Sequence, residues 1–403
     1  MNRFLPLALL VCFPLSSRAC LNDRDSDALA VQNNRFPNAL RVISGRFERN
    51  PPRFYRMRIA RVQNELKSKP RDFALYDDLA VAHDKLGDDE TALKIMAQKR
   101  ALLPVFNSKD KANKEAWYRF YANDGTFRAH RFLRDGAKVE RIGEMKRARE
   151  EIKRALQIKP NAHFGREKYQ FAVMDWIVAS KTKKTKASLA DFLDNRFELN
   201  LVDAGDQHRN YTPPELKNAA RGLSGLIVLG AAWRSPDVFH ALACCLSSRS
   251  TIGLASLALS RTEELLRGGS PSINPKALSL ADVRAQKNGL TEAGLQPLNA
   301  QTVNDLYPTL RAEAEEWSAN RNRFMEANFA QGQHPDTDAN FWNGWKDTAP
   351  PSLDVEWIDS RKYENVRITG WLLFVAFIVF GVPIFLIGRS ITRRRAKRNT
   401  SLA

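Results

Sequence analysis

The feature that most constrains this chain is an apolar run near its C-terminal end. From Ile368 to Gly388 no residue carries a charge, and at ~1.5 Å per residue such a helix reaches about 30 Å, the thickness of a bilayer core. Arg389 ends the run, and the tail 389–403 adds further bases but no acid. Because bases beside a membrane span stay on the cytoplasmic side, we expect a single transmembrane helix at 368–388. A basic cytoplasmic tail would follow it, and the rest of the chain would be extracytoplasmic (periplasmic in a bacterium).

The opposite end carries the pattern of an export signal. Residues 1–3 include one base, residues 4–15 are apolar, and Ser17 and Ala19 form a small-x-small cleavage site. A polar stretch follows at once. We therefore expect a signal peptide at 1–19, which gives the same orientation as the basic tail.

Cys20 stands directly after this cleavage site, where a bacterial lipoprotein carries its lipidated cysteine. A lipoprotein signal also needs a small residue two positions before that cysteine, and this chain has Arg18 there. We therefore expect ordinary peptidase cleavage here rather than lipidation of Cys20.

The net charge of +18 at first suggests a nucleic-acid binder. Part of the excess lies in the expected signal and tail, and the rest concentrates on residues 46–71 and 138–159, whereas residues 313–364 are acidic. These basic stretches could be solvated faces, or they could bind an acidic peptide, an anionic polymer or lipid headgroups. Outside the cytoplasm we expect no nucleic-acid partner.

Between the two ends, helical patterns recur with a period of 34 residues. Pro70 and Pro104 are 34 residues apart, and each ends a helical pattern. Gly87 marks the turn between two helices, and Ala80 and Ala92 are small where the pair must approach closely. The side chains expected to pack between these helices are Tyr76, Leu79, His83, Leu93 and Met96.

This order of apolar, small, Gly and Pro positions resembles the tetratricopeptide repeat (TPR) family, although Lys99 stands where the family usually has Ala. A second unit, 129–160, fits the same phase, with Asp135 replacing a usual Leu. Its matching positions are Phe132, Gly136, Val139, Gly143, Ala148, Ile152, Ala155 and Pro160. Because 56 residues separate Pro104 from Pro160, we expect its first helix to be lengthened.

A third, divergent unit precedes Pro70. Ile59, Val62 and Leu66 form an inner stripe, but Arg46 and Arg58 occupy positions that the resemblance expects to be small. Stacked repeats need about three units for stability. We therefore expect a TPR-like domain over residues 36–180 in an all-α chain, a solenoid of helical hairpins with further helices and one C-terminal transmembrane helix.

After a lysine-rich loop at 181–186, helical patterns resume, and we expect a helical continuation over 188–330. Within it, residues 270–303 are predicted to be irregular because they hold several prolines and glycines. The Gly-, Pro- and Asp-rich segment that follows predicts a stalk over 331–367 leading to the membrane.

The TPR resemblance implies that this part binds a protein or peptide in a concave groove, as an extracytoplasmic scaffold that assembles a complex in the cell envelope. By family position, the partner-binding candidates are Tyr76, Asp77, His83, Asp84 and Arg131. The sequence indicates no oligomeric state.

A search for catalytic, cofactor-binding or metal-binding motifs identifies no residue, so we expect no cofactor and no metal. The vicinal pair Cys244–Cys245 could be a redox or metal site, but its apolar helical flanks favour buried thiols. Two alternatives to the scaffold stay open. One is an enzyme-like domain at 188–345 that uses the repeats as a docking arm, and the other is a receptor for anionic envelope polymers.

Overall fold

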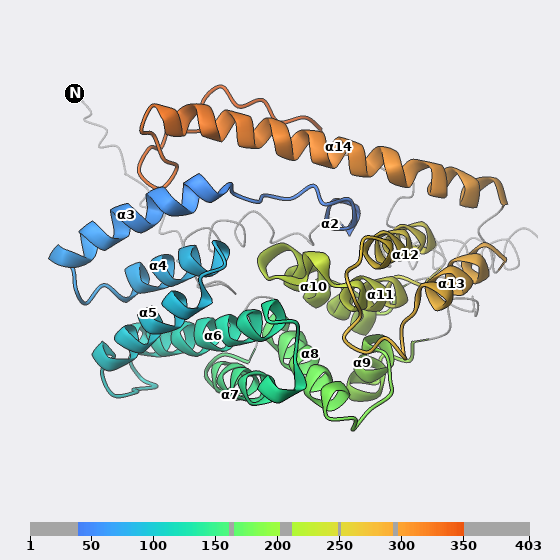
Figure 1. Ribbon diagram of the computed structural model, residues 1–403, viewed down its shortest axis with the longest axis horizontal. Coiled ribbons are helices and arrows are strands. Elements are labelled where there is room, and N and C mark those ends of the chain that lie inside the picture. Colours follow the sequence, from blue (N-terminus) through green and yellow to red (C-terminus); the bar gives the residue numbers. More distant parts are fainter. Residues whose placement is uncertain (1–38, 161–164, 202–211, 249–250, 293–296, 350–403) are drawn as a thin grey trace, which may run out of the picture.

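The computed structural model describes residues 39–160, 165–201, 212–248, 251–292 and 297–349. Within these ranges the chain forms thirteen α-helices and two short 3₁₀ turns, and it contains no strand. The expected all-α class is therefore confirmed for the described residues. Figure 1 shows two groups of helices joined at α8, with the long helix α14 lying across both groups.

The first group is a row of consecutive helices, each packed against the next along the chain (Figure 1). The helices of the row are α3 (Pro52–Ser68), α4 (Phe73–Lys85), α5 (Asp89–Leu102), α6 (Lys111–Arg134), α7 (Ile142–Ile158) and α8 (Arg166–Lys181). This sequential stacking is the arrangement that helical-repeat proteins use to bury a continuous core.

The pair α4 and α5 forms where the sequence predicts it. The side chain of Asp72 caps α4, that of Asp88 caps α5, and Gly87 makes the turn with a φ of 86°, which glycine adopts without strain. Ala80 and Ala92 are fully buried between the helices. A methyl group at each position lets the two backbones approach.

The lengthened helix expected before Pro160 is confirmed as α6, whose N-terminus is capped by Asp110. Midway along α6, Gly125 faces α7 so closely that a Cβ atom there would lie 2.9 Å from the backbone oxygen of Ala148. Glycine at this position allows α6 and α7 to pack backbone to backbone.

The divergent unit before Pro70 does not form a helical pair. Its inner stripe on α3 is confirmed, since Val62 is fully buried. The short helix α2 (Ala39–Ser44), however, packs against helices of the second group and α14 instead of α3. Arg46 and Arg58, where the resemblance expects small residues, are buried and ion-paired to the C-terminal part of the chain.

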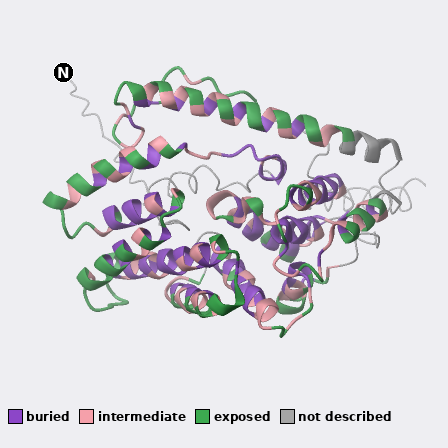
Figure 2. Cartoon of the chain, viewed as in Figure 1, coloured by how far each residue is buried: buried purple, intermediate pink, exposed green. Residues whose placement is uncertain are grey.

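The second group is packed around apolar side chains of α10, α11 and α12. Its members are α9 (Leu189–Phe197), α10 (Pro214–Leu229), α11 (Pro236–Cys245), α12 (Ile252–Arg267), α13 (Leu280–Glu292) and α14 (Pro297–Ala330). Figure 2 shows α11 and α12 mostly buried, whereas α14 exposes one side over the part whose burial is described, from residue 305 onward.

The prediction that residues 270–303 are irregular is wrong for α13. Ser279 and Asp282 form a reciprocal pair at its N-terminus: the Ser279 amide donates to the Asp282 carboxylate at 2.9 Å, and the Asp282 amide donates to the Ser279 hydroxyl at 3.2 Å. This capping box starts a helix among the prolines and glycines that suggested a loop.

Residues 331–349 do not extend as the start of a stalk. They turn at the end of α14 and lie back along it (Figure 1), held by buried groups. Asp336 receives hydrogen bonds from Arg58 at 2.8 and 2.6 Å and from Arg61 at 2.6 Å, and Phe341 is 1% exposed. We call this segment, 331–349, the C-terminal strap.

Several predictions fall outside the described residues: the signal peptide at 1–19, Cys20, the remainder of the stalk, the transmembrane helix at 368–388 and the tail 389–403. They remain predictions. Among the helices of the described residues, none is both long and apolar enough to cross a bilayer.

Candidate functional site: a hollow between α5, α6 and α7

The five partner-binding candidates lie on α4 and α6, and two of them are sealed inside the helical row. Asp77 is 1% exposed, accepts a hydrogen bond from Lys99 at 2.6 Å and a second from Asn123 at 3.0 Å. Burial raises the pKa of Asp77 and lowers that of Lys99, because the loss of hydration outweighs their mutual attraction. A partner cannot reach Asp77, so its assignment as a contact residue is corrected to a role inside the fold.

Asp84 is fully buried between α4 and α6. Its carboxylate lies 2.8 Å from His130 Nδ1 and 3.1 Å from Arg134 Nη1. Burial alone would raise the pKa of Asp84, but the attraction of His130 and Arg134 outweighs it and holds the pKa well below the usual range. Asp84 therefore joins two helices and is not available to a ligand.

The other three candidates are held by local contacts. The hydroxyl of Tyr76 donates to the Pro70 oxygen at 3.1 Å, and His83 Nδ1 lies 3.1 Å from the Asp88 carboxylate. Arg131 is partly exposed and paired with Glu144. Contact of these three residues with a partner remains a prediction.

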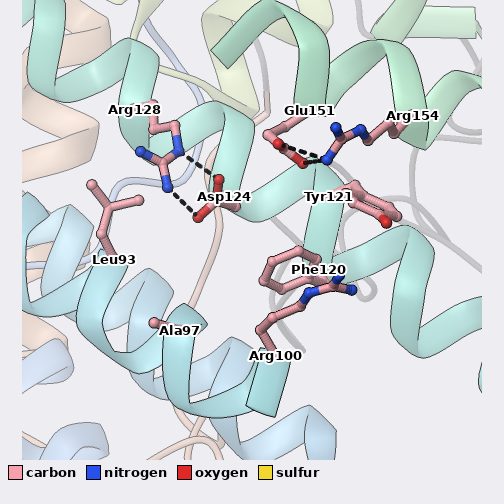
Figure 3. Close-up of a pocket in the computed structure, with 9 residues that line it drawn as sticks. All are labelled: Leu93, Ala97, Arg100, Phe120, Tyr121, Asp124, Arg128, Glu151 and Arg154. Carbon is pink, nitrogen blue, oxygen red and sulfur yellow. Dashed lines mark hydrogen bonds and ion pairs between the residues drawn. The ribbon is translucent and has the colours of Figure 1, made fainter. Parts of the chain in front are cut away.

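The structure instead shows a hollow between α5, α6 and α7, with a volume of about 220 Å³ (Figure 3). Nine side chains line it: Leu93, Ala97 and Arg100 from α5, Phe120, Tyr121, Asp124 and Arg128 from α6, and Glu151 and Arg154 from α7. α6 forms the floor, because it lies between the other two helices in the chain's packing order. Aromatic and charged side chains therefore line the hollow together.

Two ion pairs line the hollow, one on α6 and one on α7, and the charged groups that line it leave it positively charged. Arg128 donates two hydrogen bonds to the Asp124 carboxylate, at 2.6 and 3.2 Å, and Arg154 donates one to Glu151 at 3.1 Å (Figure 3). Burial raises the pKa of Glu151, and Arg154 opposes this shift only in part. Three guanidinium groups face two carboxylates, so one positive charge is in excess.

Arg100 carries that excess charge. Its guanidinium group lies 4.1 Å from the centre of the Trp117 ring and 5.6 Å from that of Phe120. It forms no direct ion pair with a carboxylate of the described residues, although Glu151, which lines the same hollow, attracts it. The stack holds the exposed Arg100 side chain in place through cation–π attraction, so its N–H groups are oriented and open to an incoming acceptor.

The residues of the hollow carry a signal in the sequence that the family positions did not use. Residues 93, 97 and 100 of α5 share one helix face, as do 120, 124 and 128 of α6. The resemblance pointed to the first helices of the two pairs, α4 and α6. The hollow is built mainly where the second helices, α5 and α7, flank α6.

The vicinal cysteines of α11 are both free thiols. Burial raises the pKa of Cys245, so this thiol stays protonated. Cys244 is half-buried, and its Sγ atom lies 3.8 Å from Nε2 of His240, a neighbour one helical turn away that sequence reasoning did not connect to it. The same Nε2 atom lies 2.8 Å from the Gln286 side-chain oxygen, so this histidine is shared with α13.

Comparison of the chain with protein-family models, with curated proteins and with solved structures gave no match. The resemblance to TPR proteins therefore rests on the residues quoted above, and the case for a function rests on the geometry of this chain.

Proposed function

We propose that this chain is a membrane-anchored, extracytoplasmic scaffold whose helical row binds an acidic segment of a protein partner in the hollow between α5, α6 and α7. The anchor in this proposal is the apolar run at 368–388, and the signal peptide at 1–19 supports the same orientation. Assembly of an envelope complex is the role that a binding domain without recognised catalytic motifs would serve there.

The observation that carries the proposal is Arg100. A guanidinium group that is fixed on an aromatic ring and forms no direct ion pair among the described residues is prepared to bind a carboxylate from a partner. Phe120 and Tyr121 beside it offer apolar surface to a neighbouring side chain of the same segment. An acidic residue next to an apolar or aromatic residue is therefore the sequence we expect the partner to present.

Crosslinking of the full-length chain in its own cells tests the proposal. A photoreactive residue in place of Ala97, which is exposed at the edge of the hollow, should capture a specific protein. The same residue in place of Lys146, exposed on α7 but not lining the hollow, is the control position. Capture of identical proteins from both positions, or of none from Ala97 in a folded chain, would refute the proposal.

A pair of substitutions identifies the contribution of charge. Arg100→Ala should reduce capture from position 97 at least tenfold, because a hydrogen bond to a charged group contributes about 1.5–3 kcal/mol. Arg147→Ala removes an equally exposed arginine on α7 outside the hollow and should leave capture unchanged. Equal losses in both variants would show that only the general positive charge of the surface matters.

A further inference from the structure

The loop between α5 and α6, residues 103–110, lies at one edge of the molecule (Figure 1), and most of its residues are exposed (Figure 2). Val105 is 90% exposed, Phe106 45% and the adjoining Leu102 37%. Among the described residues only six large apolar side chains are this exposed, and half of them lie in this one stretch. Contiguous exposed apolar surface marks an interaction site, whereas single exposed residues do not.

The loop is held rigidly in this conformation by groups beneath it. The buried Asn113 side chain donates to the Val105 backbone oxygen at 2.9 Å and accepts from the Asn107 amide at 2.8 Å. The indole N–H of Trp117 donates to the Pro104 oxygen at 2.9 Å. Because these bonds fix the backbone, the chain keeps the side chains of Val105 and Phe106 outside the core instead of folding them in.

Basic residues, which we call the rim, follow Val105 and Phe106, which we call the tip. Lys109 and Lys111 are exposed, and Lys114 is half-exposed. The acid among them, Asp110, is engaged by its hydrogen bonds to the Ala112 and Asn113 amides at the start of α6, where the helix dipole offsets its charge. The surface around the tip is therefore positively charged.

We propose that the 103–110 loop docks onto an anionic lipid surface, with Val105 and Phe106 entering the interface and the lysines contacting headgroups. Exposed aromatic and aliphatic side chains beside lysines are the combination found in segments that lie on membranes. Lysine is depleted in protein–protein interfaces, so the rim favours lipid over a protein partner.

Weak binding of the loop to lipid is sufficient for docking, because the proposed anchor holds the chain at the membrane. Only this step rests on the proposed function. Residues 350–367 lie between the strap and the apolar run, and this length of chain can span at most about 60 Å when extended. A tether of that reach keeps the described part close to the bilayer, so docking is an intramolecular event at high effective concentration. Docking would set the orientation of the helical row relative to the membrane.

Reconstitution of the full chain into liposomes tests the proposal. An environment-sensitive fluorescent amino acid in place of Phe106 should show a blue shift in liposomes of phosphatidylcholine with phosphatidylglycerol, and no shift in phosphatidylcholine alone. The same reporter in place of Val139, a 47% exposed residue in the turn before α7, should show no shift in either. Equal emission from position 106 in both lipids would overturn the proposal.

Two variants separate the contributions of the tip and the rim. Val105→Asp should abolish the blue shift at position 106, whereas Val139→Asp, the matched control, should retain it. Lys109→Glu with Lys111→Glu should abolish the dependence on phosphatidylglycerol. If Val105→Asp instead removes a crosslinked protein and leaves the lipid response intact, the loop is a protein interface and the proposal is wrong.

Discussion

The two helical groups are held together by different chemistry. In the row from α3 to α7, buried charged and amide groups connect one helix to another, as in the contact of Lys99 with Asp77 and of His130 with Asp84. In the group around α10 to α12, the buried hydroxyls of Ser260 and Thr262 bond to their own helix, and α10, α11 and α12 pack on one another mainly through apolar side chains. Polar contacts such as that of His240 with Gln286 connect these helices to α13. In the row, buried polar pairs therefore add to the close approach at small residues, whereas the packing of α10, α11 and α12 relies on apolar side chains and small residues.

The largest expected effect comes from breaking the buried pair of the row. Lys99→Met leaves the Asp77 carboxylate buried without its cation, which should lower the free energy of unfolding by about 3–5 kcal/mol. The measurement is urea-induced unfolding of the chain in detergent micelles. Because burial raises the pKa of Asp77, the loss should be smaller at pH 5, where the isolated carboxyl can take up a proton, than at pH 8.

Two controls sharpen this comparison. Asp77→Leu combined with Lys99→Met removes both charges and should recover most of the loss. Leu242→Ala in the apolar group should cost about 2–5 kcal/mol at either pH, because no ionisable group is involved. A loss of stability in Lys99→Met that is independent of pH would contradict the inference that the unpaired Asp77 carboxylate causes it.

A smaller effect is expected from the small residues of the second group. Gly222 on α10 lies against the buried ring of Tyr169 on α8, and a Cβ atom there would come within 2.1 Å of that ring. Gly222→Ala should therefore destabilise the chain by about 1–3 kcal/mol. Gly143→Ala in α7, where a Cβ meets nothing within 4 Å, should stabilise it by about 0.4–1 kcal/mol. The same sign for both, measured by thermal unfolding, would exclude close packing as the cause.

The smallest expected effect is on how steeply the stability of the chain depends on pH. Burial, together with a hydrogen bond that the protonated Asp89 carboxyl donates to Asp84, raises the pKa of Asp89 to about 7, against the partial opposition of Arg134. Since the folded state then binds this proton more tightly than the unfolded state, the group's contribution to stability falls as the pH rises from about 4 toward 7. Asp84, with its lowered pKa, contributes no slope in that range.

Asp89→Asn should consequently flatten the dependence of Tm on pH between 5 and 8, whatever the loss caused by removing the contact with Arg134. Glu90→Gln, at an exposed neighbour of Asp89, is the control and should keep the native slope. An unchanged slope in Asp89→Asn would show that Asp89 is ionised throughout this range.

The sequence predicted the helices of the row well because their boundaries are set locally. Pro70, Gly87 and Pro104 act on the backbone of their own neighbours, and the spacing of apolar residues reports the buried face directly. The lengthened α6 followed from the same counting. A helix such as α13 escaped prediction because prolines and glycines dominate the surrounding segment, and its one local helix signal is the short Ser279–Asp282 pair.

The candidate site was predicted less well because its residues depend on partners distant in the sequence. Asp77 and Asp84 are polar residues on an expected groove helix, and only the position of Lys99 and His130 shows that they point inward. The strap escaped for the same reason: the partner of Asp336 is Arg58, 278 residues away. Composition alone suggested an extended stalk there.

The strap has a mechanical consequence. The chain leaves the described part at Ala349, directly after Thr348, which is bonded to the buried Arg46 side chain, and after Asp336, which is bonded to Arg58 and Arg61. A force applied at an anchored C-terminus would therefore act on these arginines, at the start of the helical row, before it could separate α14 from the rest of the molecule. The first and last parts of the described chain would therefore share the applied force.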